Sequence, residues 1–350
     1  MINKLKVIEF AGILAGPAVG MFFAEMGAKV IKIENPKTGG DAARFWKLPE
    51  EINSEKTSAY FNSVNWNKEH VFLDLENLDD YKGMLELVKD ADIIICNWKK
   101  GDAEKLNVDY ETLKTINPKI IYGQIFGFDA NSDRVAFDMM MQAETGWLSM
   151  NGIDKNTLCK IPVAIIDLFA AHQLKEGILI ALLNRQNSNS GMQVTVSLWD
   201  AAIASLANQS SNWLNAEHLP QPMGLLHPNI APYGEVVTTK DEIQFVLAVG
   251  TDKQFKNLCE LLNLNQLAKE LSYKTNVQRV VHRKELLPLL QEKISAISSK
   301  NFMQSCEENK IPVGVIRNVQ QLFEVPEAQA LILEDAEGRR VKSAIFKIAP

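Results

Sequence analysis

The chain has 350 residues, of which 46% are hydrophobic and 23% are charged. These proportions are typical of a globular protein and exclude a collagen, a disordered tail and a small disulfide-rich domain. A chain of this length usually forms about two domains of roughly 150 residues each. Its formal net charge of −6 argues against nucleic acid and against an anionic membrane as partners.

The cysteines and histidines are too scattered along the chain to predict a metal site. Even the closest two cysteines, Cys259 and Cys306, lie far beyond the spacing of metal ligands, and no histidine belongs to a His-x-x-x-His or His-Cys cluster. So few cysteines in a long chain are typical of a reducing compartment. We therefore expect no metal site and a cytoplasmic location.

The amino-terminal segment has two features of a secretory signal, because Lys4 and Lys6 precede an uncharged run at residues 10–24. This run is shorter than the roughly 20 residues that a membrane span needs. It also contains Pro17 and three glycines, and its pattern indicates a strand, a turn and a helix. We expect the amino terminus of a cytosolic protein, without a targeting or membrane segment.

The first half of the chain alternates short apolar strands with helices. We predict a strand at residues 7–10, a turn at 12–17, a helix at 18–26 and a strand at 29–33. A helix at 81–89, a strand at 93–95, a helix at 102–115 and a strand at 119–126 follow. Such alternation favours an α/β fold with a Rossmann-like parallel sheet that helices cover on both faces.

The second half of the chain contains longer helices and then changes in character. We predict helices at residues 138–150, 168–184 and 200–214, with a strand at 193–198. A hairpin at 234–250 and helices at 251–262 and 284–298 indicate a smaller α+β domain at 225–310. A buried-strand pattern at 312–319 predicts that the chain then rejoins the first domain, which would comprise residues 1–224 and 311–350.

Three glycines near the amino terminus suggest one possible function. Gly12, Gly16 and Gly20 lie in the first turn and helix, and Glu34 ends the next predicted strand, where an acidic residue would bind a ribose in a dinucleotide site. The spacing of the glycines is wider than the Gly-x-Gly-x-x-Gly of such sites, which favours close packing of helix and strand instead. A nicotinamide dehydrogenase remains an alternative hypothesis.

Several motifs, in order along nearly the whole chain, resemble one known family. They are EFAGILAGPAVGMFFAEMGAKVIKIENPKTGGDAAR, LDL at 73–75, NWKKGDAEKLNVDYETLKTINPKIIYGQIFGF, FDMMMQAETGWLS, IPVAIIDLFAAHQLKEGILIALLNRQNSNSGMQVTVSLWDA, HPNIAPYGEV and LAVGTDKQFKNLCELL. The chain thus resembles the class III CoA-transferases, which include proteins like formyl-CoA transferase, carnitine dehydratase and the bile-acid-inducible CoA-transferase.

The resemblance implies a large domain built from both ends of the chain, a small domain, and two chains interlocked as a homodimer. It also implies an enzyme that moves CoA from an acyl-CoA donor to a small carboxylic acid. The CoA thioester is then a substrate, and no permanently bound cofactor is needed. A catalytic aspartate of the family matches Asp167 in the segment 164–168.

The residues around Asp167 support this role independently of the family. The five residues before it are apolar or proline, and Lys175 is the next charged residue after it. A carboxylate in such surroundings is partly desolvated, which makes it a stronger nucleophile than in water. The alternative is an ordinary helix cap that accepts hydrogen bonds from the first turn.

The resemblance also implies a binding site for CoA. It assigns backbone contacts, flanking of the adenine or pantetheine, phosphate binding and the pantetheine channel to nine residues. They are Ala15, Leu73, Leu75, Asn97, Trp98, Lys99, Lys105, Arg134 and Asp138. The alternatives are a solvated surface charge for each lysine and core packing for Trp98.

The chain departs from the family pattern in places that bear on function. Asn35 stands where many members have an arginine, so that Lys37 is a candidate for the missing phosphate contact. The related α-methylacyl-CoA racemases use a Gly-His-Asp motif that aligns with Ala136-Phe137-Asp138, and phenylalanine cannot carry a proton. A racemase is therefore the second hypothesis. His227, near the entry to the small domain, is interpreted as structural.

Overall fold

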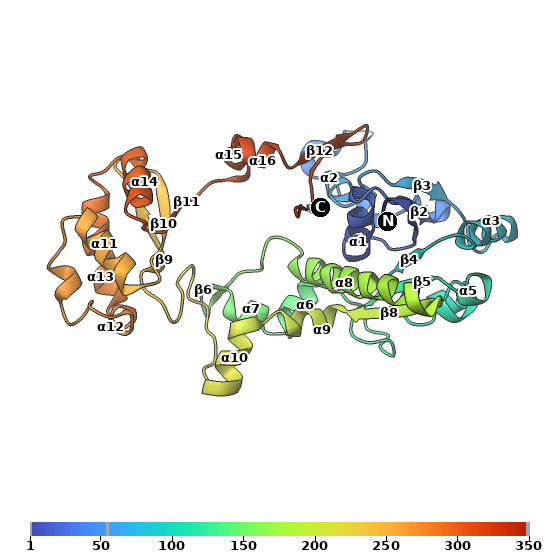
Figure 1. Ribbon diagram of the computed structural model, residues 1–350, viewed down its shortest axis with the longest axis horizontal. Coiled ribbons are helices and arrows are strands. Elements are labelled where there is room, and N and C mark those ends of the chain that lie inside the picture. Colours follow the sequence, from blue (N-terminus) through green and yellow to red (C-terminus); the bar gives the residue numbers. More distant parts are fainter. Residues whose placement is uncertain (1, 54–55, 348–350) are drawn as a thin grey trace. The chain divides into compact units, whose positions relative to one another are not determined.

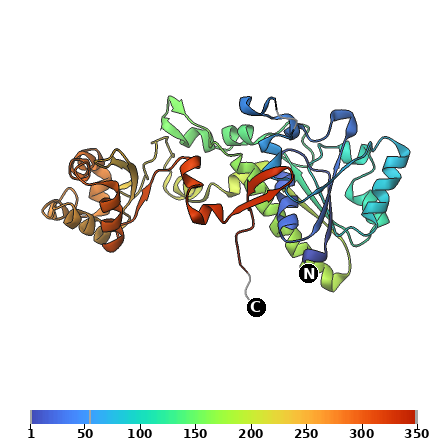
Figure 2. The same cartoon turned by 90° about the horizontal axis from the view of Figure 1, so that it is seen from above.

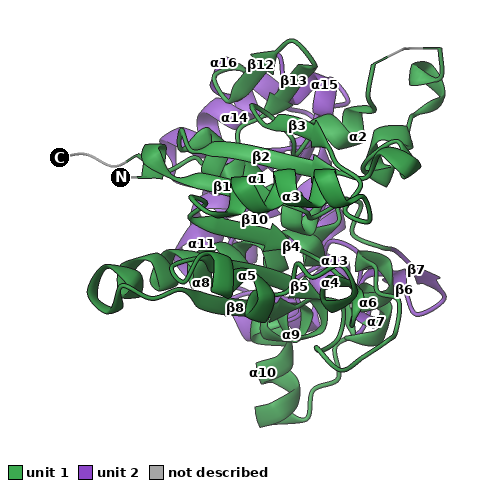
Figure 3. Cartoon of the chain, turned by 90° about the vertical axis from the view of Figure 1, so that its right-hand side faces the viewer, with its two compact units in different colours: residues 1–149, 160–220, 329–350 green, residues 150–159, 221–328 purple. Residues whose placement is uncertain are grey.

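The structure is a computed structural model that describes residues 2–53 and 56–347. The chain divides into two compact units, which Figure 3 shows in different colours. Unit 1 comprises residues 1–149, 160–220 and 329–350, and unit 2 comprises residues 150–159 and 221–328. Within the described residues, no helix combines the length and the apolar character that crossing a membrane requires.

Unit 1 is built on a sheet of six parallel strands, which confirms the predicted α/β fold. Its strands are β1 (Lys6–Glu9), β2 (Lys29–Glu34), β3 (Glu69–Phe72), β4 (Ile93–Cys96), β5 (Ile121–Phe126) and β8 (Met192–Ser197). Their order across the sheet is β3-β2-β1-β4-β5-β8, and every neighbouring pair is parallel. The order reverses between β1 and β4, where open α/β sheets bind their ligands beyond the carboxyl ends of the strands.

Helices cover both faces of this sheet (Figure 1). The helices of unit 1 are α1 (Ala15–Glu25), α2 (Ala59–Asn62), α3 (Leu78–Val88), α4 (Asp102–Lys105), α5 (Tyr110–Ile116), α6 (Asp138–Glu144), α7 (Trp147–Met150), α8 (Ile165–Ser188), α9 (Leu198–Ala204) and α10 (Ala207–Ala216). One core cluster joins the sheet to α1, α8 and α9, and another joins its opposite face to α3, α4 and α5.

The two cores explain why the strands are almost continuously apolar. Val7 and Ile8 are neighbours in β1, yet they pack in different cores, because successive side chains of a strand point to opposite faces. In β4, Ile95 belongs to the first core, whereas Ile94 and Cys96 belong to the second. Strands buried on both faces need apolar residues at every position.

Three predicted helices are each broken into two. Asn107 (φ 53°), Ala207 (φ 49°) and Gly146 (φ 90°) have left-handed backbones within the segments predicted as single helices at 102–115, 200–214 and 138–150. A left-handed residue cannot continue a right-handed helix. The sequence prediction also missed β3, because this edge strand begins with the polar pair Glu69 and His70 and lacks the apolar pattern of a buried strand.

Unit 2 contains a three-stranded antiparallel sheet with helices packed against it. Its strands are β9 (Tyr233–Thr238), β10 (Gln244–Ala248) and β11 (Val313–Val315), and its helices are α11 (Asp252–Leu261), α12 (Asn276–Val281), α13 (Arg283–Ile294) and α14 (Ser299–Glu308). A separate hairpin is formed by β6 (Gly152–Asp154) and β7 (Thr157–Leu158). The core of this unit includes a T-shaped contact between Phe245 and Phe302, whose ring centroids are 5.3 Å apart.

The return of the chain to unit 1 occurs later than the sequence prediction placed it. The strand pattern at 312–319 was expected to rejoin the first domain, but β11 pairs with β10, with Phe245 opposite Val315. An apolar strand pattern does not specify which sheet the strand joins, because register and partner depend on tertiary packing. Two short helices, α15 (Val319–Leu322) and α16 (Pro326–Gln329), follow β11 before unit 1 resumes.

The carboxyl-terminal segment packs against the amino-terminal part of unit 1. A hairpin of β12 (Ile332–Asp335) and β13 (Gly338–Val341) contacts α2, where Asn62 donates a hydrogen bond to the carbonyl of Glu337. Farther along, the carboxylate of Glu25 accepts hydrogen bonds from the backbone amides of Ser343 and Ala344. In Figure 2 this segment is red and lies beside the blue amino-terminal part.

The remaining described elements are short 3-10 helices. They are η1 (Ile2–Lys4), η2 (Pro36–Thr38), η3 (Ala42–Phe45), η4 (Pro49–Glu51) and η5 (Leu267–Lys269). Two of them, η2 and η3, follow β2 directly at the carboxyl end of the sheet. They bring Asn35 and Asp41, their respective N-cap residues, to the edge where the strand order reverses.

Candidate active site

Two adjoining cavities lie at the carboxyl end of the parallel sheet in unit 1. The first, of about 360 Å³, is lined by residues that follow β1, β2, β3 and β4. The second, of about 220 Å³, lies on the side of β4 and β5 and reaches the start of α8. Gly12 and Trp98 line both cavities, so the two are contiguous across the point where the strand order reverses.

The site residues expected from sequence gather at these cavities. The first cavity is lined by Leu73, Leu75, Trp98 and Lys105, and the second by Ala15, Asn97, Trp98, Lys99, Arg134 and Asp167. Asp138 follows Phe137, which lines the second cavity, and its carboxylate contacts the backbone of Asp167. The fold thus brings together residues that lie far apart along the chain.

The turn after β1 forms a wall of both cavities and has an unusual backbone conformation. Ile13 has φ 72°, a left-handed conformation that a β-branched residue rarely adopts. The side-chain amide of Asn97 makes two hydrogen bonds with the backbone of Gly12. Its Oδ1 accepts from the Gly12 nitrogen at 3.1 Å, and its Nδ2 donates to the Gly12 oxygen at 2.9 Å. Asn97 therefore shapes the turn as well as lining the cavity.

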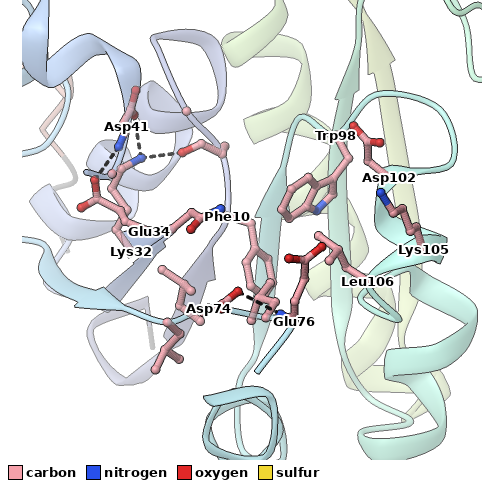
Figure 4. Close-up of a pocket in the computed structure, with 17 residues that line it drawn as sticks. Phe10, Lys32, Glu34, Asp41, Asp74, Glu76, Trp98, Asp102, Lys105 and Leu106 are labelled. Carbon is pink, nitrogen blue, oxygen red and sulfur yellow. Dashed lines mark hydrogen bonds and ion pairs between the residues drawn. The ribbon is translucent and has the colours of Figure 1, made fainter. Parts of the chain in front are cut away.

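Trp98, Lys99 and Lys105 line the cavities in different surroundings. The Trp98 ring packs on Phe10 at a centroid distance of 5.8 Å, and its buried indole nitrogen has no hydrogen-bond partner among the described residues. Lys105 lies beside Asp102 on the first cavity (Figure 4). Lys99 lines the second cavity. The Trp98 ring thus contributes both to the core and to the cavity wall.

Lys37 is bound by carboxylates in this structure. Its ammonium lies 2.9 Å from Asp74 and 2.8 Å from Glu76, and both of these residues line the first cavity. The hydrogen bonds to Glu76 and Asp74 raise the pKa of Lys37 to about 12. Asn35, which stands where many family members have an arginine, accepts a hydrogen bond from the backbone of Lys37. Lys37, the candidate for the missing phosphate contact, is therefore paired with Asp74 and Glu76 in this structure.

Both carboxylate oxygens of Glu34 are hydrogen-bonded to other groups of the protein. Its Oε2 accepts from Arg44 Nε at 2.7 Å and from the Asp41 amide at 2.8 Å, and its Oε1 accepts from Arg44 Nη2 at 2.6 Å and contacts His70 at 2.8 Å. Burial opposes ionisation, but the bonds from Arg44 and His70 prevail and hold the pKa of Glu34 well below its usual range. No oxygen of Glu34 remains for a ribose hydroxyl, so the geometry does not support the dehydrogenase hypothesis.

Two of the three glycines are explained by close packing. A Cβ added at Gly16 would lie 2.2 Å from the Cβ of Ala11, and one added at Gly20 would lie 1.7 Å from Glu9 Oε2. These distances leave no room for a side chain, whereas a Cβ at Gly12 would meet only Asp41 at 3.5 Å. The wide spacing of the glycines therefore reflects the approach of α1 to β1, as the packing interpretation predicted.

Asp167 lies in the first turn of α8 and is 8% exposed. Asp167 lines the second cavity, and no hydrogen bond from a described residue contributes to the pKa of its carboxyl. Burial and, secondarily, the charge of Asp138 raise the pKa of Asp167 to about 7. The sequence prediction of a partly desolvated carboxylate agrees with this environment.

Asp138, rather than Asp167, supplies the helix cap at the start of α8. Ala164, the N-cap residue of α8, makes no side-chain cap, and Asp138 Oδ1 accepts from the backbone nitrogens of Ile166 at 2.7 Å and Asp167 at 3.4 Å. The other oxygen of Asp138 accepts from Gln142 Nε2 at 2.6 Å. Asp138 therefore fixes the start of α8 and leaves the Asp167 side chain free of a capping role.

Arg134 and His227 have local partners. The guanidinium of Arg134 pairs with Glu144 at 2.7 Å and lies 4.0 Å above the Phe128 ring, while its side chain lines the second cavity. In unit 2, His227 Nδ1 accepts a hydrogen bond from the Asn229 amide at 3.1 Å. The contacts of His227 shape a turn, in agreement with the structural role predicted for it.

Two residues near the site escaped the sequence analysis. Tyr60, on α2, is within electrostatic reach of Asp167 and Asp138, and burial together with these charges raises the pKa of Tyr60 to about 12. Asp41 binds the backbone of Ile13. Tyr60 lies outside the motifs quoted above, and Asp41 lies within one of them but carries no sequence feature that reveals its contact with Ile13, so only tertiary position identifies the role of either residue. Within residues 2–53 and 56–347, no cluster of acidic, cysteine or histidine side chains is arranged to hold a metal ion.

Comparison with known proteins identifies the class. Residues 2–336 match the family model described as CoA-transferase family III. The chain therefore belongs to CoA-transferase family III and is an enzyme of this class.

Individual relatives are similar over most of their length. The succinate–glutarate CoA-transferase of Agrobacterium fabrum strain C58 is 36% identical over 94% of this chain and 83% of its own. The acetyl-CoA:oxalate CoA-transferase of Acetobacter aceti is 28% identical over 94% of this chain and 84% of its own. A crystal structure of a CaiB/BaiF family protein from Brucella suis superposes with a TM-score of 0.87 at 33% identity, covering 99% of this chain and 92% of that one.

Proposed function

We propose that this protein transfers CoA from an acyl-CoA donor to a small carboxylic acid, with Asp167 as the nucleophile. The observation that carries the proposal is a buried aspartate that lines a cavity at the ligand-binding edge of the sheet and whose carboxyl has no hydrogen-bond donor among the described residues. The names of the relatives, which include succinate, glutarate and oxalate CoA-transferases, support a small dicarboxylic acid as a substrate.

The reaction requires only successive exchanges at activated acyl groups. The Asp167 carboxylate attacks the thioester carbonyl and expels CoA thiolate, which leaves an acyl–aspartyl anhydride. The thiolate attacks the aspartyl carbonyl, which releases the donor acid and forms an aspartyl–CoA thioester. The acceptor carboxylate then attacks this thioester to form a second anhydride and free thiolate. Attack of the thiolate on the acceptor carbonyl yields the new acyl-CoA and regenerates Asp167.

The environment of Asp167 suits this role in two ways. Its ionised form is the nucleophile, and a pKa of about 7 keeps a substantial fraction ionised near neutral pH. The same desolvation that raises the pKa weakens the hydration that the carboxylate would lose on attack. Tyr60 stays protonated in this pH range and is a hydrogen-bond donor within electrostatic reach of Asp167.

The two contiguous cavities match the two ends of a CoA thioester. We assign the nucleotide end to the first cavity, with Leu73, Leu75 and Trp98 on its wall and Lys105 for phosphate. We assign the pantetheine and thioester end to the second cavity, which Asp167 lines together with Ala15, Asn97, Trp98 and Arg134. Lys99 lines the same cavity and is assigned to phosphate, and Asp138 contacts the backbone of Asp167 beside it.

The family resemblance and the cysteines support two further proposals. We infer that two chains interlock as a homodimer, as the family does, and that the enzyme works in the cytoplasm. All four cysteines are free, three of them buried, which suits a reducing compartment.

The assay that tests this function offers succinyl-CoA or acetyl-CoA with glutarate or oxalate and follows the new CoA ester. Transfer that needs the acceptor acid, and that Asp167→Asn reduces by several orders of magnitude, supports the proposal. The racemase hypothesis predicts instead that deuterium from the solvent enters the α-carbon of a branched acyl-CoA without an acceptor. Phe137, which lines the second cavity in place of a histidine, argues against that outcome.

A further inference from the structure

A cluster of four buried charges lies directly beneath the turn that lines both cavities. Glu9 on β1 binds Lys32 at 3.0 Å and Lys68 at 2.8 Å, and Lys32 also binds Asp41 at 3.1 Å. The side chains of all four residues are at most 2% exposed. Two ammonium groups and two carboxylates give the cluster a formal charge of zero, which is the condition for burying such groups.

The cluster holds the turn at three points of its backbone. Lys32 Nζ donates to the carbonyl of Ala11, and Lys68 Nζ donates to the carbonyl of Pro17 at 2.9 Å. Between these points, both carboxylate oxygens of Asp41 lie 3.0 Å from the amide nitrogen of Ile13. Figure 4 shows Lys32 and Asp41 beside the first cavity. Every one of these contacts joins a buried charge to the backbone of residues 11–17.

Ile13 is the residue whose conformation needs such support. Its left-handed backbone, at φ 72°, is strained for a β-branched residue. Strain of this kind persists only where the surroundings hold it in place, and it concentrates at functional sites. Gly12, Ile13, Leu14 and Ala15 line the cavity that contains Asp167, so relaxation of Ile13 would move the wall around the nucleophile.

We propose that Asp41 is a positioning residue, whose carboxylate, neutralised by Lys32, holds Ile13 in its left-handed conformation and thereby fixes the cavity wall at residues 12–15 for reaction at Asp167. The proposal rests on the proposed function of Asp167. Burial would lower the pKa of Lys32, but Glu9 and Asp41 raise it above its usual range, so that the Lys32 ammonium stays charged and neutralises the Asp41 carboxylate. Asn in place of Asp41 would place an amide donor against Lys32 and would remove the negative charge of the Asp41 carboxylate.

The experiment compares Asp41→Asn in three backgrounds, which are the natural chain, Ile13→Gly and Ile13→Ala. Glycine adopts a positive φ without strain, whereas alanine retains the strain, and both substitutions remove the isoleucine side chain beyond Cβ. The readouts are kcat for CoA transfer, the KM for acyl-CoA and the affinity for CoA. A displacement of about 1 Å in the wall can change the rate by roughly 100-fold.

We expect Asp41→Asn to lower kcat by about 10- to 100-fold in the natural chain and in Ile13→Ala, with a smaller change in affinity for CoA. In the Ile13→Gly background, the same substitution is expected to lower kcat by no more than about threefold. Asp90→Asn, which removes the partner of Lys6 at an exposed site, is the matched control and should leave kcat unchanged.

Equal losses in all three backgrounds would overturn the proposal, because Asp41 would then act only by balancing charge in the cluster. Failure of Asp41→Asn to fold in all three backgrounds would overturn it for the same reason, whereas folding only with Ile13→Gly would support it. No loss in the natural chain would also overturn it. Failure of the proposed function is recognised separately, as transfer activity in the natural chain that survives Asp167→Asn.

Discussion

The carboxylate of Asp138 accepts a hydrogen bond from the backbone amide of Asp167, and its charge adds to the effect of burial in raising the pKa of the Asp167 carboxyl to about 7. Asp138 thus positions the backbone of Asp167 and also helps to raise its pKa. The stronger bond, at 2.7 Å from the Ile166 amide, caps α8 from a different segment of the chain. Capping from a distance leaves the side chain of Asp167 free to face the cavity.

Asp138→Asn tests the electrostatic half of this relationship. The rate of reaction with subsaturating acyl-CoA should rise with pH around an inflection near 7 in the natural enzyme, because the ionised Asp167 is the nucleophile. Without the charge at position 138, the inflection should move below 7, while the amide oxygen can still cap α8. Asp138→Ala, which also loses the cap, is the control. An unchanged inflection in both variants would show that Asp138 does not influence Asp167.

Asp167→Asn should stabilise the protein in a pH-dependent way. The folded-state pKa of Asp167, about 7, lies above the unfolded value of about 3.9, so the folded state loses stability as the pH rises through 7. The cost of holding the ionised form approaches about 4 kcal/mol above that pH, as an upper limit. The variant should therefore exceed the natural protein in free energy of unfolding at about pH 8.5 and differ much less at about pH 4.5. Urea denaturation at the two pH values measures this, and a pH-independent difference would contradict it.

Arg44→Met should destabilise unit 1 by about 3 kcal/mol, because it leaves the buried Glu34 carboxylate without its bidentate partner. The pKa of Glu34 is lowered in the folded state, so the contribution of the pair is present above the unfolded value of about 4.3 and is lost as the pH falls. The destabilisation should therefore shrink below about pH 4. Arg134→Met removes a similar but exposed pair with Glu144 and should cost less than about 1 kcal/mol. Equal effects of the two substitutions in denaturant titrations would refute the account.

Gly20→Ala and Gly83→Ala should have opposite effects on stability. A Cβ at Gly20 would overlap the carboxylate of Glu9 within the buried charge cluster, whereas a Cβ at Gly83 on α3 would meet no atom within 4 Å. The first substitution should destabilise the protein by more than about 2 kcal/mol. The second should stabilise it by about 0.5–1 kcal/mol, because alanine favours a helix interior over glycine. Thermal unfolding distinguishes them, and a harmless Gly20→Ala would mean that α1 can move away from β1.

The central parallel strands could be predicted from sequence for a physical reason. β4, with Ile93, Ile94 and Ile95 in succession, is buried on both faces, so that a continuous apolar run marks it. β3 could not be predicted in the same way, because it is an edge strand with polar residues. The breaks at Asn107 and Ala207 depend on single backbone angles, which helical periodicity does not reveal.

A site residue was predictable where its neighbours in the sequence determine its environment. Asp167 follows an apolar segment and begins a long helix, and both features are visible in sequence. The role of Asp41 was not visible, because its partner Ile13 lies 28 residues away and no propensity predicts a left-handed isoleucine. The engagement of Glu34 by Arg44 and His70 likewise depends on the tertiary fold, so the dinucleotide hypothesis could be tested only against the structure.

The most direct test of the account is intact-protein mass spectrometry after the enzyme is mixed with an acyl-CoA in the absence of an acceptor. The account predicts a covalent adduct of the mass of the acyl group or of CoA, located on the peptide that contains Asp167 and discharged by a carboxylic acid. Asp167→Asn should form no adduct, while Asp90→Asn, at an exposed ion pair, should form it normally. An enzyme that transfers CoA without any adduct, or one whose adduct persists in Asp167→Asn, would contradict the claim that Asp167 is the nucleophile.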